Sequence, residues 1–251
     1  MGQHLIAWSQ SITSTAMAAR NAVPDPSVRV SGVDILIPPI FSKLCMAYGQ
    51  GVNLAQAQFQ SPTLRRRYPL DVSPIDIAAT PTGPFAPLMD LTSRPIDLDV
   101  GEQLEAFLAD TAAGANIVRA LAWLTDGDFS LPAGPIFTFR TTASATLVAE
   151  TWTNASLTLS NLLPYGTYAV VGFRAASATL IAARLVFPGP IFARPGVIGT
   201  TTASQLDDRR FRFGAFGNLG QFVSIAPPTV DFLATAGDTS EVVHLDLVKV
   251  A

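Results

Sequence analysis

Turn-forming residues recur about every ten positions along this chain, between short apolar runs. The 251 residues include 18 Gly and 19 Pro, and the runs between them are rich in Val, Ile, Leu, Thr and Phe. Runs of this kind separated by such turns are typical of strands, and many short strands favour an antiparallel sandwich or barrel. The sequence therefore predicts an all-β fold.

Eleven runs are expected to form strands. They cover residues 28–37, 74–79, 95–100, 116–124, 136–142, 145–152, 156–162, 167–174, 179–187, 222–225 and 242–250. Residues 102–110 fit either a strand or a short helix. Residues 167–187 predict a long hairpin whose strands are apolar on both faces, either inside a sandwich or beneath a partner. In the final run, residues 242–250, apolar and polar residues alternate in part, so one of its faces is expected to be exposed to solvent.

Two segments favour helices. Residues 1–22 carry an apolar stripe at helical spacing, which ends before two prolines and consists of Leu5, Trp8, Ile12, Ala16 and Ala19. Residues 52–60 are mostly Ala, Leu and Gln. We expect a helical N-terminal arm at residues 1–27, followed by a β domain at residues 28–251 that the sequence leaves as one sandwich or two.

Charged residues make up only 14% of the chain, about half the usual share for a soluble domain. The composition excludes intrinsic disorder and a highly basic nucleic-acid binder. Residues 1–68 carry a net charge of +4, residues 69–128 carry −8, and the remainder carries +1. Basic and acidic segments of different copies could meet, or both could be solvated faces of one domain.

The usual patterns of enzyme active sites are missing from the sequence. No Gly-x-Ser-x-Gly occurs, and the two histidines, His4 and His244, lie far apart in the chain. We expect Cys45 to be a buried structural residue, and the glycine-rich residues 214–220 to form a loop packed by its own aromatic rings. The sequence predicts no enzymatic activity and no cofactor.

Four aspartates are candidate metal ligands, and a structural role is the alternative for each pair. Asp97 and Asp99 would share one face of a strand, whereas Asp126 and Asp128 flank a glycine at a turn. Asp-Gly is also a preferred hairpin turn, so the sequence predicts no metal site.

Three consecutive arginines, Arg65, Arg66 and Arg67, form the densest basic run. Arginine suits phosphate, so this run is a candidate contact for nucleic acid. A solvated loop or a subunit salt-bridge site are the alternatives.

The longest uncharged stretch, residues 151–173, contains a proline and several polar residues. A membrane-spanning helix is therefore not expected there. The N-terminus lacks the basic start and the long apolar run of a signal peptide.

Two stretches carry a family resemblance. One is a buried strand ending in an acidic glycine turn, Asn116-Ile117-Val118-Arg119-Ala120-Leu121-Ala122-Trp123-Leu124-Thr125-Asp126-Gly127. The other runs from 163 to 175 and continues through 182–187 to 194–197. In texture and strand order they resemble the jelly-roll capsid proteins of tailless, often membrane-containing, icosahedral phages, over about residues 70–250.

That resemblance implies a jelly-roll β-sandwich and a shell subunit of the virion without catalysis. It implies assembly with itself into trimers or larger capsomers, and contact with other virion proteins.

Two alternatives stay open. Residues 163–168 are also similar to the tyrosine corner of immunoglobulin-like sandwiches, which implies an extracellular binding or adhesion module. The third reading is a hydrolase on a β scaffold with His244 as its base.

Overall fold

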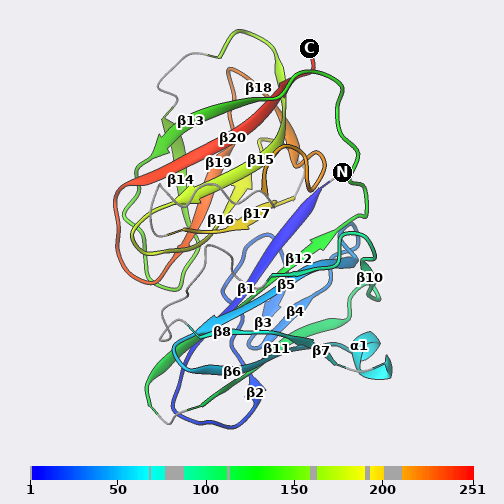
Figure 1. The fold of residues 1–251 in the computed structure, drawn as a ribbon, viewed down its shortest axis with the longest axis vertical. Coiled ribbons are helices and arrows are strands. Elements are labelled where there is room, and N and C mark those ends of the chain that lie inside the picture. The colour runs from blue at the N-terminus through cyan, green and yellow to red at the C-terminus, as the bar shows by residue number, and fades with distance from the viewer. Residues whose placement is uncertain are drawn as a thin grey trace. The chain divides into compact units, whose positions relative to one another are not determined.

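The computed structural model describes residues 2–67, 69–76, 88–111, 114–158, 163–189, 193–200 and 211–251. In these ranges the regular elements are strands apart from one α-helix, which confirms the expected all-β class. The strands fall into two units (Figure 1). One consists of Ile6–Asp126, and the other of Met1–Leu5 with Gly127–Ala251.

The unit Ile6–Asp126 contains two sheets. The first has the order β1-β12-β5-β10, and β8 and β9 also pair with β5. Its strands are β1 (Gln3–Ile12, of which Ile6–Ile12 belong to this unit), β5 (Lys43–Gly51), β8 (Ile75–Asp76), β9 (Met89–Asp90), β10 (Ile96–Asp97) and β12 (Asn116–Thr125). The second has the order β3-β4-β11-β6-β7, and β2 pairs with β11. Its strands are β2 (Ala18–Ala19), β3 (Val30–Ser31), β4 (Asp34–Leu36), β6 (Leu54–Gln60), β7 (Leu70–Val72) and β11 (Gln103–Asp110).

The core of this unit lies between its two sheets. Trp8 of β1 and Phe59 of β6 meet edge to face, with ring centroids 5.6 Å apart, and both side chains are fully buried. Every second residue of β11, from Leu104 to Leu108, is buried, which is the period expected of a strand with one face on a core. The two sheets therefore form a β-sandwich.

The second unit has its strands in one continuous order, β17-β16-β19-β14-β13-β20-β15-β18. They are β13 (Phe137–Ala143), β14 (Thr153–Thr158), β15 (Thr167–Ala176), β16 (Leu180–Val186), β17 (Gly196–Ile198), β18 (Gly220–Val223), β19 (Thr229–Ala234) and β20 (Glu241–Lys249). Among the described residues, two pairs join β13 to β14, Thr142 with Thr158 and Ala143 with Leu157. This short junction connects two rows of four strands.

Both units follow one pattern of pairing. We number the eight main strands of each unit from 1 to 8 in chain order. In both units the two rows then have the strand orders 1-8-3-6 and 2-7-4-5. The eight main strands of the first unit are β1, β4, β5, β6, β7, β10, β11 and β12. In the second unit the nested pairs β13 with β20, β14 with β19, β15 with β18 and β16 with β17 are all antiparallel. Each unit is thus one long antiparallel ribbon rolled up into two rows.

The helix expected within residues 1–22 is wrong. Residues 3–12 form β1, in which Leu5 to Trp8 are buried without a break. A strand covered on both faces buries consecutive residues, so its apolar positions can coincide with a helical stripe. The helical form of the N-terminal arm is therefore corrected, whereas its limits, residues 1–27 and 28–251, stay a prediction.

The helix expected at residues 52–60 is also wrong, because Leu54–Gln60 is strand β6. Ala57 and Phe59 are fully buried, and the glutamines between and after them are partly exposed. This alternation of period two outweighs the helical propensity of Ala and Gln, since propensity is a weak preference compared with burial.

The hairpin expected at residues 167–187 is wrong in its pairing. Both strands exist, but β15 lies between β20 and β18, and β16 lies between β19 and β17. Both are buried along almost their whole length, as the sequence predicted. The turn at residues 177–179 therefore leads from one row to the other.

Most of the other strand predictions hold. Residues 116–124, 136–142, 222–225 and 242–250 correspond to β12, β13, β18 and β20, residues 28–37 to β3 and β4, and residues 95–100 to the short β10. Residues 102–110 are a strand, β11. Residues 74–79 contain β8, and residues 156–162 contain the end of β14. The remaining positions 77–79 and 159–162 lie outside the described residues.

Residues 145–152 form no strand, because Glu150 has a left-handed backbone with φ 54°. The wet face expected for residues 242–250 is wrong in its second half, where Asp246 and Val248 are buried.

Candidate functional site

The arginine run lies on the short helix α1 (Pro62–Arg67) of the unit Ile6–Asp126. The helix begins where the Ser61 hydroxyl accepts a hydrogen bond from the Leu64 amide at 3.1 Å, and Leu64 is its buried residue. The Glu102 carboxylate accepts a second bond from the Thr63 amide at 2.9 Å. All three arginines are exposed.

Acidic side chains of the same unit neutralise part of this run. Arg65 lies 2.6 Å from Glu105, and Arg66 lies 3.7 Å from Asp99. Exposed pairs of this kind contribute about 0–1 kcal/mol each. The basic and acidic segments of the sequence thus meet within one chain, which leaves fewer free cations for nucleic acid than the sequence suggested. Contact of Arg65, Arg66 and Arg67 with nucleic acid or another subunit stays a prediction.

The structure does not gather the four candidate aspartates into one cluster. Asp97 pairs with Lys43 at 3.5 Å across β10 and β5, and Asp99 pairs with Arg66. Hydrogen bonds from the Ser130 hydroxyl and then from its amide, which donates at 3.0 Å, lower the pKa of the Asp128 carboxyl. Asp128 follows Gly127, whose φ is 90°. In the described ranges no three His, Cys, Asp or Glu side chains come together as metal ligands.

Cys45 is fully buried in β5, and its thiol lies 3.3 Å from the carbonyl oxygen of Trp123. Burial raises the pKa of this thiol far above its usual range. A nucleophile must be a thiolate, so the expected structural role fits this environment. The two histidines lie on β1 and β20.

The glycine-rich loop is packed by aromatic rings, as expected. Phe211 and Phe216 lie 5.2 Å apart between centroids. Gly217 has φ 71°, and a Cβ there would fall 2.5 Å from the Phe129 backbone, so only glycine fits.

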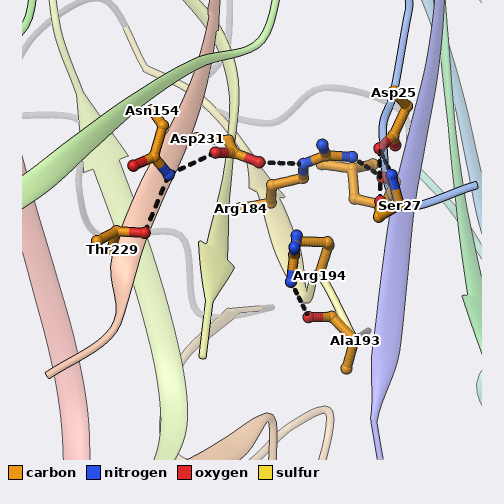
Figure 2. Close-up of polar contacts among 9 residues, drawn as sticks. Asp25, Ser27, Asn154, Arg184, Ala193, Arg194, Thr229 and Asp231 are labelled. Atoms are coloured by element: carbon orange, nitrogen blue, oxygen red, sulfur yellow. Dashed lines mark hydrogen bonds and ion pairs between the residues drawn. The ribbon is translucent and has the colours of Figure 1, made fainter. Parts of the chain in front are cut away.

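A buried polar network crosses the second unit (Figure 2). Arg184 of β16 is fully buried, and its Nε donates to Asp231 of β19 at 3.0 Å. Its Nη1 donates to the Leu5 carbonyl at 3.2 Å, and the guanidinium lies 4.1 Å from the centre of the Trp152 ring. The amide of Asn154 donates to the other Asp231 oxygen at 2.7 Å. The network holds β14, β16 and β19 in one arrangement.

A second buried ion pair lies in the other row of this unit. Arg174 of β15 donates to Asp246 of β20 at 2.9 Å, and the Thr138 hydroxyl donates to the same oxygen at 2.7 Å. The Phe213 amide donates to the second Asp246 oxygen at 3.1 Å. A Cβ at Gly172 would collide with this carboxylate, which explains the glycine in a buried strand.

Sequence reasoning missed both buried networks. A lone charged residue inside an apolar run could have indicated each network, because charged side chains are almost never buried unless they are paired. The partners were not available, since Arg174 and Asp246 are 72 residues apart.

The tyrosine corner is confirmed as a local structure. The Tyr168 hydroxyl donates to the Pro164 carbonyl at 2.8 Å, four residues upstream. The surrounding strand order differs from that of an immunoglobulin sandwich, in which the first, second, fifth and fourth strands are neighbours.

Exposed apolar side chains gather at one end of the row β13-β20-β15-β18. The register brings the start of β13 and β15 to the ends of β20 and β18, since Phe137 pairs with Leu247 and Thr167 with Val223. The exposed residues here are Ile136, Phe137, Tyr165, Val223, Ile225 and Val250, which we call the apolar end. Beside it lies a groove of about 460 Å³, lined by Ser130, Leu131, Pro132, Ala133, Asn218, Gln221, Lys249 and Val250.

None of the helical segments that the structure describes has the length and apolar character required to cross a bilayer.

No protein-family model matches the chain, and no curated protein matches it. Two solved structures are similar. The major capsid protein P2 of bacteriophage PM2 is 10% identical with a TM-score of 0.25, over 99% of this chain and 98% of that one. A Paenibacillus xanthan lyase is 12% identical with a TM-score of 0.22, over 95% of this chain and 25% of that one. TM-scores this far below 0.5 do not establish a shared fold with either protein.

Proposed function

We propose that each unit is a jelly roll and that the chain is a capsid subunit, which assembles with itself into trimers or larger capsomers of a virion. The observation that carries the proposal is the nested pairing 1-8, 2-7, 3-6 and 4-5, which recurs in both units. Rolling one antiparallel ribbon in this way gives the double-sheet jelly roll, an architecture of viral capsid proteins, lectin domains and cupins.

The surface of the second unit favours assembly among these roles. Fold alone does not decide function, so the choice rests on the apolar end. Its exposed residues come from four neighbouring strands or their flanking turns, and Tyr165 and Ile225 are each 77% exposed. Exposed apolar side chains that gather at one end of a sheet are candidates for protein–protein contact. In the proposed shell, this end contacts another copy or another virion protein.

A shell role makes no use of a catalytic residue or a cofactor. The buried networks around Arg184 and Arg174 join neighbouring strands of the second unit. The two other readings, an adhesion module and a hydrolase with His244 as base, predict instead a saturable extracellular ligand and measurable turnover.

The proposal is tested by light scattering and negative-stain microscopy of the purified chain. We expect assemblies larger than a monomer, and we expect Tyr165→Asp and Ile225→Asp to shift them toward monomers without lowering the unfolding temperature. Val148→Asp is the matched control, because Val148 is 55% exposed in the same unit but beyond the opposite end of β13. A wild-type chain that stays monomeric at high concentration, or variants that assemble like the wild type, would overturn the proposal.

A further inference from the structure

A buried carboxylate without a partner lies at the start of β20. Glu241 is 1% exposed, and neither oxygen of its carboxylate has a hydrogen-bond partner among the described residues. Its side chain is on the same side of the strand as Val243 and Leu245, which are buried in the core. Burying a carboxylate is costly unless it is paired or hydrogen-bonded, so this carboxylate requires a partner.

The charged group that acts on Glu241 within the described ranges is a second carboxylate. Burial, followed by Asp238, raises the pKa of the Glu241 carboxyl, and the amides of Ala145 and of Glu241 itself act against this rise. Neither amide makes a hydrogen bond of ordinary geometry to the carboxylate. Two acidic groups therefore lie near each other at this end of the second unit.

Asp238 is fixed in the loop between β19 and β20. Its Oδ1 accepts a hydrogen bond from the Thr239 amide at 2.8 Å, and its Oδ2 accepts one from the Ala178 amide at 2.9 Å. Its main-chain carbonyl accepts a third from the Leu147 amide at 3.0 Å. Two other segments of the unit thus hold this residue in place. Asp238 is half-buried, so solvent ions can reach it.

A third oxygen lies beside Asp238. Ser177 is 6% exposed and acts on the charge of Asp238. Its Oγ is buried and makes no hydrogen bond of ordinary geometry within the described ranges. Buried hydroxyls are normally hydrogen-bonded, so Ser177 is an independent sign that a ligand belongs here.

We propose that Glu241, Asp238 and Ser177 bind a calcium ion. Calcium takes about six to eight oxygen ligands and accepts a bidentate carboxylate, and Glu241 has two free oxygens to offer. A carboxylate has about four lone-pair sites, so Asp238 can bind the ion beside the amides that it accepts. Main-chain carbonyls or water would supply the remaining ligands. The two positive charges of the ion balance the two carboxylates and remove the cost of burying Glu241.

The calcium site is separate from the aspartate pairs of the sequence and from the proposed shell role. It uses neither Asp97 with Asp99 nor Asp126 with Asp128, and it lies within one unit of one chain. A monomer that binds calcium would refute the shell role and leave this site in place.

The first experiment measures calcium binding by calorimetry, with the full chain first freed of divalent ions by EDTA. We expect saturable binding by the wild type, at least about tenfold weaker binding by Glu241→Gln, and unchanged binding by Asp128→Asn. Asp128 is the matched control, because it is an exposed carboxylate of the same unit. The proposal is overturned by no saturable binding up to about 10 mM calcium, by equal binding to Glu241→Gln, or by a loss in Asp128→Asn.

The second experiment compares unfolding temperatures at pH 7 in calcium and in EDTA. At a calcium concentration about a hundredfold above the Kd, the wild type should unfold about 5–10 °C higher than in EDTA. Glu241→Gln should unfold above the wild type in EDTA, because it removes the buried charge, and calcium should leave it unchanged. A wild type that calcium does not stabilise, or a variant that calcium stabilises equally, would refute the site.

A third arm repeats the titration with magnesium. Magnesium demands near-octahedral geometry and usually keeps several of its waters, whereas a bidentate carboxylate requires the more irregular shell of calcium. We therefore expect magnesium to bind at least about tenfold more weakly. Equal affinity for the two ions would refute the assignment to calcium.

Discussion

Replacing Arg184 by Met should destabilise the second unit by about 3–5 kcal/mol, because it breaks a buried ion pair by removing one partner. Arg184 is fully buried, and its replacement would leave the Asp231 carboxylate, which is 12% exposed, without this cation, while the Asn154 amide still donates to it. The Leu5 carbonyl would also lose the donor 3.2 Å away. At about 3 °C per kcal/mol, the unfolding temperature should fall by about 9–15 °C.

Urea unfolding followed by tryptophan fluorescence measures this loss. Trp152 lies against Arg184 and reports on the second unit, whereas Trp8 and Trp123 lie in strands of the other. The midpoint of the unfolding transition that Trp152 reports should therefore move to a lower urea concentration. Arg140→Met is the control, since an exposed arginine should change stability by less than about 0.5 kcal/mol.

A double-mutant cycle separates the ion pair from general damage to the core. Asp231→Leu should also be destabilising, since it leaves Arg184 charged and buried. The double variant Arg184→Met with Asp231→Leu should be clearly more stable than the sum of the two losses predicts, by about 2 kcal/mol or more. Additive losses, or a loss below about 1 kcal/mol for Arg184→Met, would refute the reasoning.

Two further predictions concern β15 and β20. Gly172→Ala should cost about 1–3 kcal/mol, because its Cβ would displace the Asp246 carboxylate; chemical denaturation should show this loss, and unchanged stability would contradict the close approach. In EDTA, Glu241→Gln should stabilise the chain at pH 7 but not at pH 4. Burial, and next Asp238, raises the pKa of the Glu241 carboxyl, so the folded state binds its proton more tightly than the unfolded state. The wild type therefore loses stability as the pH rises from the unfolded pKa through the folded one. Urea midpoints at both pH values check this, and a variant that gains equally at both would contradict it.

Local patterns explain why most strands could be predicted. Strands β12, β13, β15, β16 and β20 each contain an apolar or alternating run bounded by turn residues, and these features act within a few positions. The same local reasoning failed at β1 and β6. There the apolar spacing and the Ala and Gln content fitted a helix, and burial against distant strands decided otherwise.

The candidate site shows the same limit. The arginine run was visible in the sequence, but its partners Glu105 and Asp99 are 40 and 33 positions away from Arg65 and Arg66 and were brought to them by folding. The pairing of β13 with β20 in the second unit was invisible for the same reason. Arg140 and His244 are more than 100 residues apart in the chain and become neighbours only when β13 pairs with β20.

The sequence by itself determined that the chain is all-β, that its charge is sparse and unevenly distributed, and that Tyr168 ends a corner bonded to its own upstream chain. These properties depend on contacts within about ten residues. Only the tertiary structure decided that the strands form two rolled ribbons and that β15 pairs with β20 rather than with β16. Backbone hydrogen bonds are alike for any two strands, so the choice of partner depends on which faces can be buried together across the whole unit.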